Sequence, residues 1–235
     1  MLKKWLKKLP IPLTQNHRYD LQAKKVMKKV LEHDSCCIDI GCHEGEFLDL
    51  FLKYAPQGMH FGFEPIPSLY KKLTAIYSSP CQLFEVALSN KKGESSFNHV
   101  LSNPAYSGLK KRQYDHPNEK DTTIKVETDL LDNLIDINQP IDFIKIDVEG
   151  GEYQVLQGAR KTIQKHKPYI IFEHGLGAAD QYGTKPEMLY ALLVEEYDLH
   201  ISTMQNWLIG KSPFSKKTFE QHFYEGKDYY FMAYA

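Results

Sequence analysis

Short apolar runs alternate with segments of helical periodicity along most of this chain, and this alternation constrains its fold more than any other feature. The runs are four to seven residues long, as strands buried on both faces of a parallel sheet usually are. A helical pattern follows the first run, with Phe47, Leu48 and Phe51 on one face. Strands that alternate with helices predict a parallel sheet with right-handed crossovers. The expected strands lie at residues 36–40, 60–63, 82–88, 141–146 and 169–172.

Two further apolar runs, at residues 199–204 and 229–235, raise the expected number of strands to seven. No long helical pattern clearly separates them, so we expect an antiparallel hairpin at one edge of the sheet. Seven strands in 235 residues fit an open, doubly wound α/β sheet better than a closed eight-stranded barrel. No internal repeat or linker interrupts the chain. We therefore predict an N-terminal helical segment at residues 1–34 and one domain at residues 35–235.

Charge and hydrophobicity exclude several classes of partner. Lys and Arg number 29 and Asp and Glu number 30, which gives a formal net charge of −1, whereas nucleic-acid-binding domains are usually basic. No stretch approaches the ~20 apolar residues of a transmembrane helix. Residues 1–9 place lysines opposite Leu and Trp at helical spacing, which fits weak contact with an anionic membrane surface or a short helix packed on the domain. We expect neither a nucleic-acid partner nor a transmembrane segment.

The cysteine pattern bears on metal binding and on cellular compartment. None of the four cysteines has the CxxC spacing that paired zinc ligands show. We therefore expect buried free thiols in a reducing, cytoplasmic compartment, and no metal site. The four are Cys36, Cys37, Cys42 and Cys81.

The turn after the first strand carries the first candidate binding residues, because ligands of open α/β sheets bind beyond the carboxyl ends of the strands. It reads D-x-G-x-x-x-G, from Asp39 through Gly41 to Gly45. The glycines permit a tight turn and close approach by a ligand. The third glycine of a pyrophosphate fingerprint is missing, which argues against a nicotinamide dehydrogenase. The pattern suits a ligand with an ammonium group that Asp39 attracts, directly or through water. The alternative interpretation is a tight turn without a ligand-binding role.

Glu64 ends the second expected strand, 23 residues after Gly41. A carboxylate at this place can accept both ribose hydroxyl protons of a nucleoside ligand, and the alternative is an ordinary solvated acid. A ligand that combines an amino-acid head, a ribose and an adenine is S-adenosylmethionine. The two strand ends together therefore indicate this cofactor.

Several segments together resemble one family, the FkbM-type S-adenosylmethionine-dependent methyltransferases. The resemblance covers roughly residues 36 to 175, and its most specific part is K-I-D-V-E-G-G-E at residues 145–152. The matching segments are residues 39–45, 63–67, 87–89, 141–152, 155–159 and 168–173. The resemblance implies a Rossmann-like class I methyltransferase fold.

The resemblance also implies roles for particular residues. Asp39, Gly41 and Gly45 would line the methionine end of the cofactor site. The other expected cofactor contacts are Glu64 with Pro65 at the ribose and Val86 with Ala87 near the adenine. His43 stands where the family usually has Asn, so it would contact either the cofactor or the acceptor.

The implied reaction is methylation of a hydroxyl on a sugar, glycan, lipid or natural-product acceptor. Asp147 and Glu149 would face the methyl-transfer centre. His174 follows a strand end and is a candidate general base, because histidine titrates near neutral pH; an inert polar residue is an equal alternative. Two carboxylates are too few ligands to indicate a divalent metal.

Two other functions remain open at this stage: a non-catalytic cofactor-binding or scaffolding protein on the same fold, and a protein lysine methyltransferase. The polar stretch at residues 95–123 shows little periodicity. We expect it to be an irregular loop that recognises the acceptor.

Overall fold

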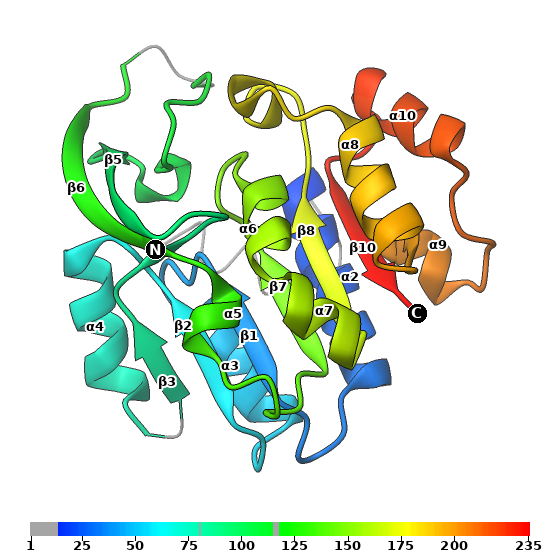
Figure 1. The fold of residues 1–235 in the computed structure, drawn as a ribbon, viewed down its shortest axis with the longest axis horizontal. Coiled ribbons are helices and arrows are strands. Elements are labelled where there is room, and N and C mark those ends of the chain that lie inside the picture. The colour runs from blue at the N-terminus through cyan, green and yellow to red at the C-terminus, as the bar shows by residue number, and fades with distance from the viewer. Residues whose placement is uncertain (1–13, 80, 115–117) are drawn as a thin grey trace.

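The computed structural model describes residues 14–79, 81–114 and 118–235. Its centre is a seven-stranded sheet in the order β3-β2-β1-β7-β8-β10-β9 (Figure 1). The first five strands in this order pair in parallel, whereas β10 runs antiparallel to both β8 and β9. The strands are β1 (Cys37–Ile40), β2 (His60–Phe63), β3 (Cys81–Phe84), β7 (Phe143–Ile146), β8 (Tyr169–Glu173), β9 (His200–Ser202) and β10 (Tyr230–Tyr234).

The predicted doubly wound, mostly parallel sheet of seven strands is therefore confirmed. The antiparallel pair at one edge is also present, because β9 is the edge strand and pairs with β10. Two helices, α9 (Met204–Leu208) and α10 (Lys216–Tyr224), connect this pair in place of a tight turn.

Helices cover both faces of the sheet. In Figure 1, α2 (Gln15–Val30) and α3 (Glu46–Tyr54) lie behind the sheet, and α6 (Glu152–Gly158) and α7 (Arg160–His166) lie in front of it. The helix α2 begins at a capping residue, Thr14, whose side chain accepts a hydrogen bond from the His17 backbone N–H. The remaining helical segments are α2 (Gln15–Val30), α3 (Glu46–Tyr54), α4 (Pro67–Tyr77), α5 (Leu131–Leu134), α6 (Glu152–Gly158), α7 (Arg160–His166), α8 (Pro186–Tyr190) with a π-helical continuation at Ala191–Glu196, and the 3-10 turns η1 (Pro104–Tyr106) and η2 (Ala179–Tyr182).

The strands are apolar on both faces because both faces are covered. Ile144 and Ile170 belong to the core cluster that includes α6 and α7. Phe143 and Ile171, one residue away on the same strands, belong to the core cluster that includes α2 and α3. Successive residues of a strand therefore face opposite layers of helices, and the same rule determines which face the residues after each strand end point to.

A second, smaller sheet corrects our expectation for the two ends of the polar stretch, because residues 95–100 and 121–123 belong to strands. Its order is β4-β6-β5, and β5 pairs with β6 antiparallel over eight register positions. Much of this pair is solvent-exposed, and Phe97 and Val126 are among its few buried side chains, so the sequence lacks a strong apolar pattern. The expected strand at residues 82–88 is also divided, since its last residues leave the main sheet. The strands of the small sheet are β4 (Ala87–Leu88), β5 (Gly93–Val100) and β6 (Asp121–Asp129).

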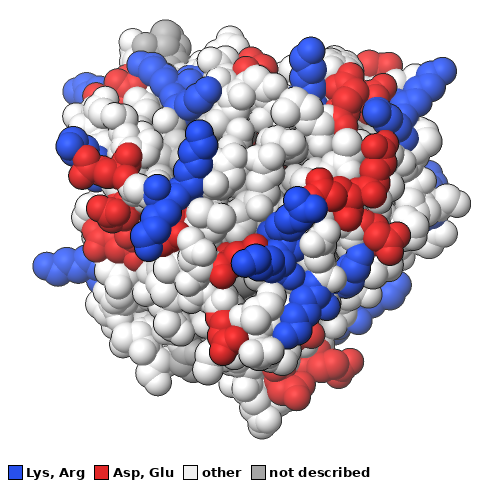
Figure 2. Space-filling view, viewed as in Figure 1, with Lys and Arg blue, Asp and Glu red and all other residues white. Residues whose placement is uncertain are grey.

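The surface agrees with the charge balance of the sequence. Figure 2 shows Lys and Arg interspersed with Asp and Glu on the face that carries α6 and α7, without a continuous basic area on that face. Within the described part of the chain, no helix is long and apolar enough to span a membrane. Residues 1–9, with their expected membrane or packing role, lie outside the described residues.

Candidate active site

The turn after β1 is built so that only glycine fits at its first bend. Gly41 has a φ of +81°, and a Cβ atom added there would lie 2.0 Å from the backbone oxygen of Asp147. Gly45 has a φ of +83° and precedes α3. The Gly41 N–H donates to the Phe63 carbonyl at 3.0 Å, which ties the turn to the end of β2. The close approach of the Gly41 and Asp147 backbones therefore leaves no room for a side chain at this turn.

Glu64 lies directly beside this turn. Its carboxylate accepts hydrogen bonds from the backbone N–H groups of His43 and Ile66, each at 2.9 Å. Burial raises the pKa of Glu64 to about 7, although the two N–H groups lower it. Glu64 is thus a fixed, buried acceptor that joins the ends of β1 and β2.

A narrow cleft leads away from Glu64 and is lined by residues of both sheets. The structure brings Glu64, Pro65, Val86 and Ala87 together in its wall, with Gly41 and His43 also lining it. The rest of the wall is largely apolar, which suits a flat aromatic ring. These further apolar residues include Ile66, Leu88, Phe97, Ala105 and Leu109.

Asp39 lies behind the turn and lines neither this cleft nor the cavity described below. Its carboxylate is fully buried, and the Lys145 ammonium lies 3.1 Å away. Burial raises the pKa of Asp39, and Lys145 lowers it. Lys145 also donates to the Gly41 carbonyl at 2.6 Å. This placement does not support a direct contact between Asp39 and a ligand ammonium, because Lys145 occupies the carboxylate.

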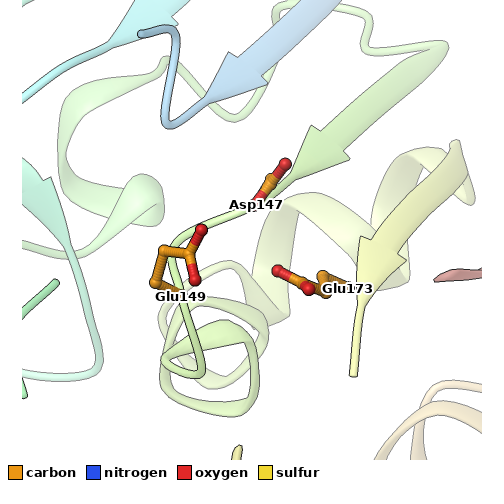
Figure 3. A group of neighbouring side chains, drawn as sticks. All are labelled: Asp147, Glu149 and Glu173. Atoms are coloured by element: carbon orange, nitrogen blue, oxygen red, sulfur yellow. The ribbon is translucent and has the colours of Figure 1, made fainter. Parts of the chain in front are cut away.

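Three carboxylates meet beyond the ends of β7 and β8, where Figure 3 shows Asp147, Glu149 and Glu173 turned toward one another. One oxygen from each lies within 4.8 Å of the other two. Asp147 accepts a hydrogen bond from the Tyr230 hydroxyl at 3.0 Å. Glu149 forms an ion pair with Arg112. We call these three residues the acidic cluster.

The acidic cluster is strained and electrostatically unusual. Glu149 has a φ of +59°, a left-handed conformation that is costly for a residue with a side chain and is common at functional sites. Burial and the neighbouring Asp147 raise the pKa of Glu149 to about 8, although Arg112 lowers it. Burial and Glu149 raise the pKa of Glu173 well above its ordinary range. Glu149 therefore holds a proton at neutral pH and loses it only in mildly alkaline solution.

A wider cavity of about 560 Å³ adjoins the narrow cleft, and Gly41, His43, Asp147 and Glu149 line both. It has room for a sugar-sized molecule. Six aromatic side chains line it: Tyr19, Phe47, Tyr106, Phe223, Tyr229 and Tyr230. The acidic cluster thus lies where the two spaces meet.

The segment between β5 and β6 covers this junction. Its Arg112 reaches Glu149 and lies 4.6 Å from the ring centroid of Tyr106. The Gln113 N–H donates to the Gly177 carbonyl at 2.9 Å, which anchors the segment on the main body. Part of the predicted acceptor-recognition stretch therefore does line the site, although residues 115–117 lie outside the described range.

The sequence matches a known protein family over most of the sheet. The model of the methyltransferase FkbM domain matches residues 39–204, a range that contains the β1 turn, Glu64 and the acidic cluster. The chain belongs to the FkbM methyltransferase family. The resemblance seen in the K-I-D-V-E-G-G-E segment is thereby confirmed.

Two known proteins illustrate the similarity. The 2-O-methyltransferase NoeI of Sinorhizobium fredii is 28% identical over 166 residues, which cover 64% of this chain and 68% of NoeI. The crystal structure of an FkbM methyltransferase from Methylobacillus flagellatus superposes with a TM-score of 0.54 and 16% identity. That match covers 88% of this chain but only 45% of the crystallised chain, and it establishes the fold alone.

His174 does not join the site of this FkbM domain. Its ring stacks on Phe223 at 4.4 Å between centroids, and neither ring nitrogen has a hydrogen-bond partner within the described residues. Burial lowers the pKa of His174 to about 3. Successive residues of a strand point to opposite faces, so Glu173 faces the acidic cluster and His174 faces the core. We withdraw His174 as a candidate base.

Sequence reasoning did not single out Glu173 or Tyr230 as site residues, and it placed Arg112 only within the stretch expected to recognise the acceptor. Glu173 carried a signal, since it ends a predicted strand. Arg112 lies in a segment without periodicity, and Tyr230 belongs to a strand far along the chain, so neither could be placed beside the acidic cluster without the fold. The expected burial of the four cysteines as free thiols is confirmed.

Proposed function

We propose that this FkbM-family protein transfers a methyl group from S-adenosylmethionine to a hydroxyl oxygen of a sugar, glycan, lipid or natural product. One observation carries the proposal: a narrow, largely apolar cleft that leads away from Glu64 and a wide cavity meet at Asp147 and Glu149. Such a junction suits a reaction between two ligands that enter from different sides. The 28% identity to a 2-O-methyltransferase supports oxygen as the acceptor atom.

The cleft fits the cofactor in its polar and apolar parts. Glu64 offers a buried carboxylate to ribose hydroxyls, with Pro65 beside it. Val86 and Ala87 offer an apolar wall to the adenine. Gly41 and Gly45 shape the turn that would receive the methionine end, and His43 lines both spaces. When bound, S-adenosylmethionine supplies an activated methyl group.

The chain's own residues then have to align the acceptor and accept its proton. Asp147 and Glu149 line both spaces, so they are placed to hold the acceptor hydroxyl beside the cofactor end of the cavity. Glu173 completes the cluster from β8. Because the pKa of Glu149 is about 8, its ionised form is suited to take the hydroxyl proton as the bond to carbon forms.

The acidic cluster also favours an enzyme over a scaffolding protein. Three converging carboxylates and a left-handed Glu149 are costly to maintain, and cofactor binding alone does not require them. Methylation of a protein lysine can be distinguished from this reaction by experiment, because the transferred methyl group would then be bound to nitrogen and not to oxygen.

The direct test is transfer of an isotopically labelled methyl group. The protein is incubated with methyl-labelled S-adenosylmethionine and fractionated cell extract, and the labelled product is identified by mass spectrometry. We expect the label on a hydroxyl oxygen of a small molecule, glycan or lipid. Label on a protein lysine, or none in any fraction, would contradict the proposal.

A further inference from the structure

Charge is distributed unevenly along the chain. Residues 1–34 contain nine Lys and Arg against three Asp and Glu, whereas residues 35–235 contain 20 Lys and Arg against 27 Asp and Glu. The first part therefore has a formal charge of +6 and the remainder one of −7, although the whole chain carries −1. Such an asymmetry is typical of proteins whose basic part contacts a nucleic acid or an anionic membrane.

The helix α2 carries five of these basic side chains on the side that faces away from the sheet. Four of the five are exposed and the other is half-buried, whereas Tyr19 and Val26 on the opposite side of the helix are buried in the core. The one acidic residue of α2, Asp20, lines the wide cavity. We call the five residues the basic face of α2: Arg18, Lys24, Lys25, Lys28 and Lys29.

The basic face of α2 is not neutralised by neighbouring carboxylates. Within the described part of the chain, none of its five side chains forms an ion pair with an Asp or Glu. Exposed lysines elsewhere do have such partners: Lys92 with Asp129, Lys125 with Glu94 and Lys227 with Glu225. The five cations of α2 are therefore left to attract an anionic partner from solution.

An apolar segment without acidic residues lies beside the basic face of α2. The Lys29 ammonium lies 4.7 Å from the ring centroid of Trp207, a half-buried residue of α9. Ile209 follows α9 directly and is 57% exposed. Residues 199–219 contain no Asp or Glu and add three lysines. Trp and exposed aliphatic side chains next to lysines are the combination that proteins use at the membrane–water interface.

We propose that this protein docks on an anionic membrane surface, with the basic face of α2 turned toward the lipid head groups. The apolar side chains beside the cations favour a lipid surface over a nucleic acid, because a phosphate backbone offers them no apolar contact. The charge of −7 on residues 35–235 would also repel a long polyanion that extends beyond α2. Tyr19 and Ala23, on the opposite side of α2, line the wide cavity, so this docking does not use the residues of the cavity.

The test measures co-sedimentation of the whole chain with lipid vesicles at low salt. Neutral vesicles of phosphatidylcholine are compared with anionic vesicles of three parts phosphatidylcholine to one part phosphatidylserine. A Lys or Arg close to an anionic lipid surface strengthens binding about fivefold, so we expect the anionic vesicles to bind the protein at least about tenfold more tightly than the neutral ones. Because the attraction is electrostatic, the difference should shrink in high salt.

A matched pair of double variants locates the docking surface. Lys25→Gln with Lys28→Gln removes two exposed cations from the basic face of α2, and binding to anionic vesicles should weaken about tenfold. Lys71→Gln with Lys72→Gln removes the same charge from exposed residues of α4, which packs on β3, and binding should stay within about twofold. Circular dichroism checks that both variants remain folded. Equal losses in the two variants would show that only net charge matters and would contradict the assignment to α2.

Three further results would overturn the inference: no binding to anionic vesicles, equal binding to both kinds of vesicle, or unchanged binding of the α2 double variant. A double-stranded DNA oligonucleotide and poly-glutamate serve as polyanions without a lipid phase, and tighter binding to either of them than to anionic vesicles would also overturn it. The measurement uses neither cofactor nor acceptor. Loss of the proposed methyl transfer would therefore leave this inference intact, and absence of vesicle binding would leave the proposed function intact.

Discussion

Asp39 and Lys145 are register partners on the parallel strands β1 and β7, and the Lys145 ammonium lies 3.1 Å from the Asp39 carboxylate. Their neighbours on the same face, Cys37 and Phe143, are buried and apolar. Lys145 also donates to the Gly41 carbonyl. Lys145 therefore holds the β1 turn through the Gly41 carbonyl and neutralises the charge of the buried Asp39 carboxylate.

Replacing Lys145 alone should destabilise the protein strongly. Lys145→Met leaves the Asp39 carboxylate buried without a partner, which typically costs about 3–5 kcal/mol. Urea unfolding followed by circular dichroism measures the loss. The double variant Asp39→Asn with Lys145→Met should recover a large part of it. Equal instability of the single and double variants would show that the ion pair is not the reason.

Two glycines with similar φ angles allow a matched test of the turn. Gly41 and Gly210 have φ values of +81° and +71°, but a Cβ at Gly210 would meet nothing within 4 Å. Gly210→Ala should cost about 1–2 kcal/mol, the cost of a left-handed residue. Gly41→Ala adds a clash with the backbone of Asp147, so we expect about 3–5 kcal/mol in urea unfolding. Equal losses would contradict the close packing of the turn on Asp147.

The main sheet could be predicted because its strands are apolar on both faces, which leaves a strong signal in the sequence. The small sheet could not, because β5 and β6 are largely exposed and bury few side chains such as Phe97. The sequence also does not show which face of the sheet each residue of β8 points to, because Ile170, Ile171 and Phe172 are all buried. The faces taken by Glu173 and His174 could therefore not be predicted. Only the packing of α10 against His174 determines them.

Cofactor affinity should depend on pH through Glu64. Its pKa of about 7 exceeds the ordinary 4.5, so the group is partly protonated below neutrality. The ionised carboxylate is the form that accepts both ribose hydroxyls, and S-adenosylhomocysteine should bind about tenfold more tightly at pH 8 than at pH 6. Titration calorimetry across this range measures the change.

The Glu64→Gln variant is the control for that profile. It cannot ionise, so its affinity should be lower by about 1–3 kcal/mol at pH 8 and nearly flat with pH. An unchanged affinity at pH 8 would remove Glu64 from the binding site. The effect of pH on stability is opposite to its effect on affinity. Between pH 4.5 and about 7 the folded protein binds more protons at Glu64 than the unfolded chain does, so the contribution of Glu64 to the free energy of unfolding falls as pH rises through that range.

His174→Leu should change stability in acid and leave turnover intact. Because burial lowers the pKa of His174 from 6.5 to about 3, the unfolded chain binds more protons between these values. The His174 contribution is therefore full above pH 6.5 and is lost as pH falls. Relative to His174→Leu, the wild-type protein should lose about 2 kcal/mol between pH 7 and pH 5 in urea unfolding. Parallel pH profiles of the two proteins would contradict the neutral, buried state of this ring.

We propose that Asp147 and Glu149 act on the acceptor while Glu64 holds the cofactor. The most direct measurement compares the variants Asp147→Asn and Glu149→Gln with wild type, using the acceptor identified by label transfer. An interaction made mainly in the transition state affects rate more than binding. We predict that S-adenosylhomocysteine affinity stays within about threefold while turnover falls by about 10²-fold or more. Full turnover in both variants would contradict the claim.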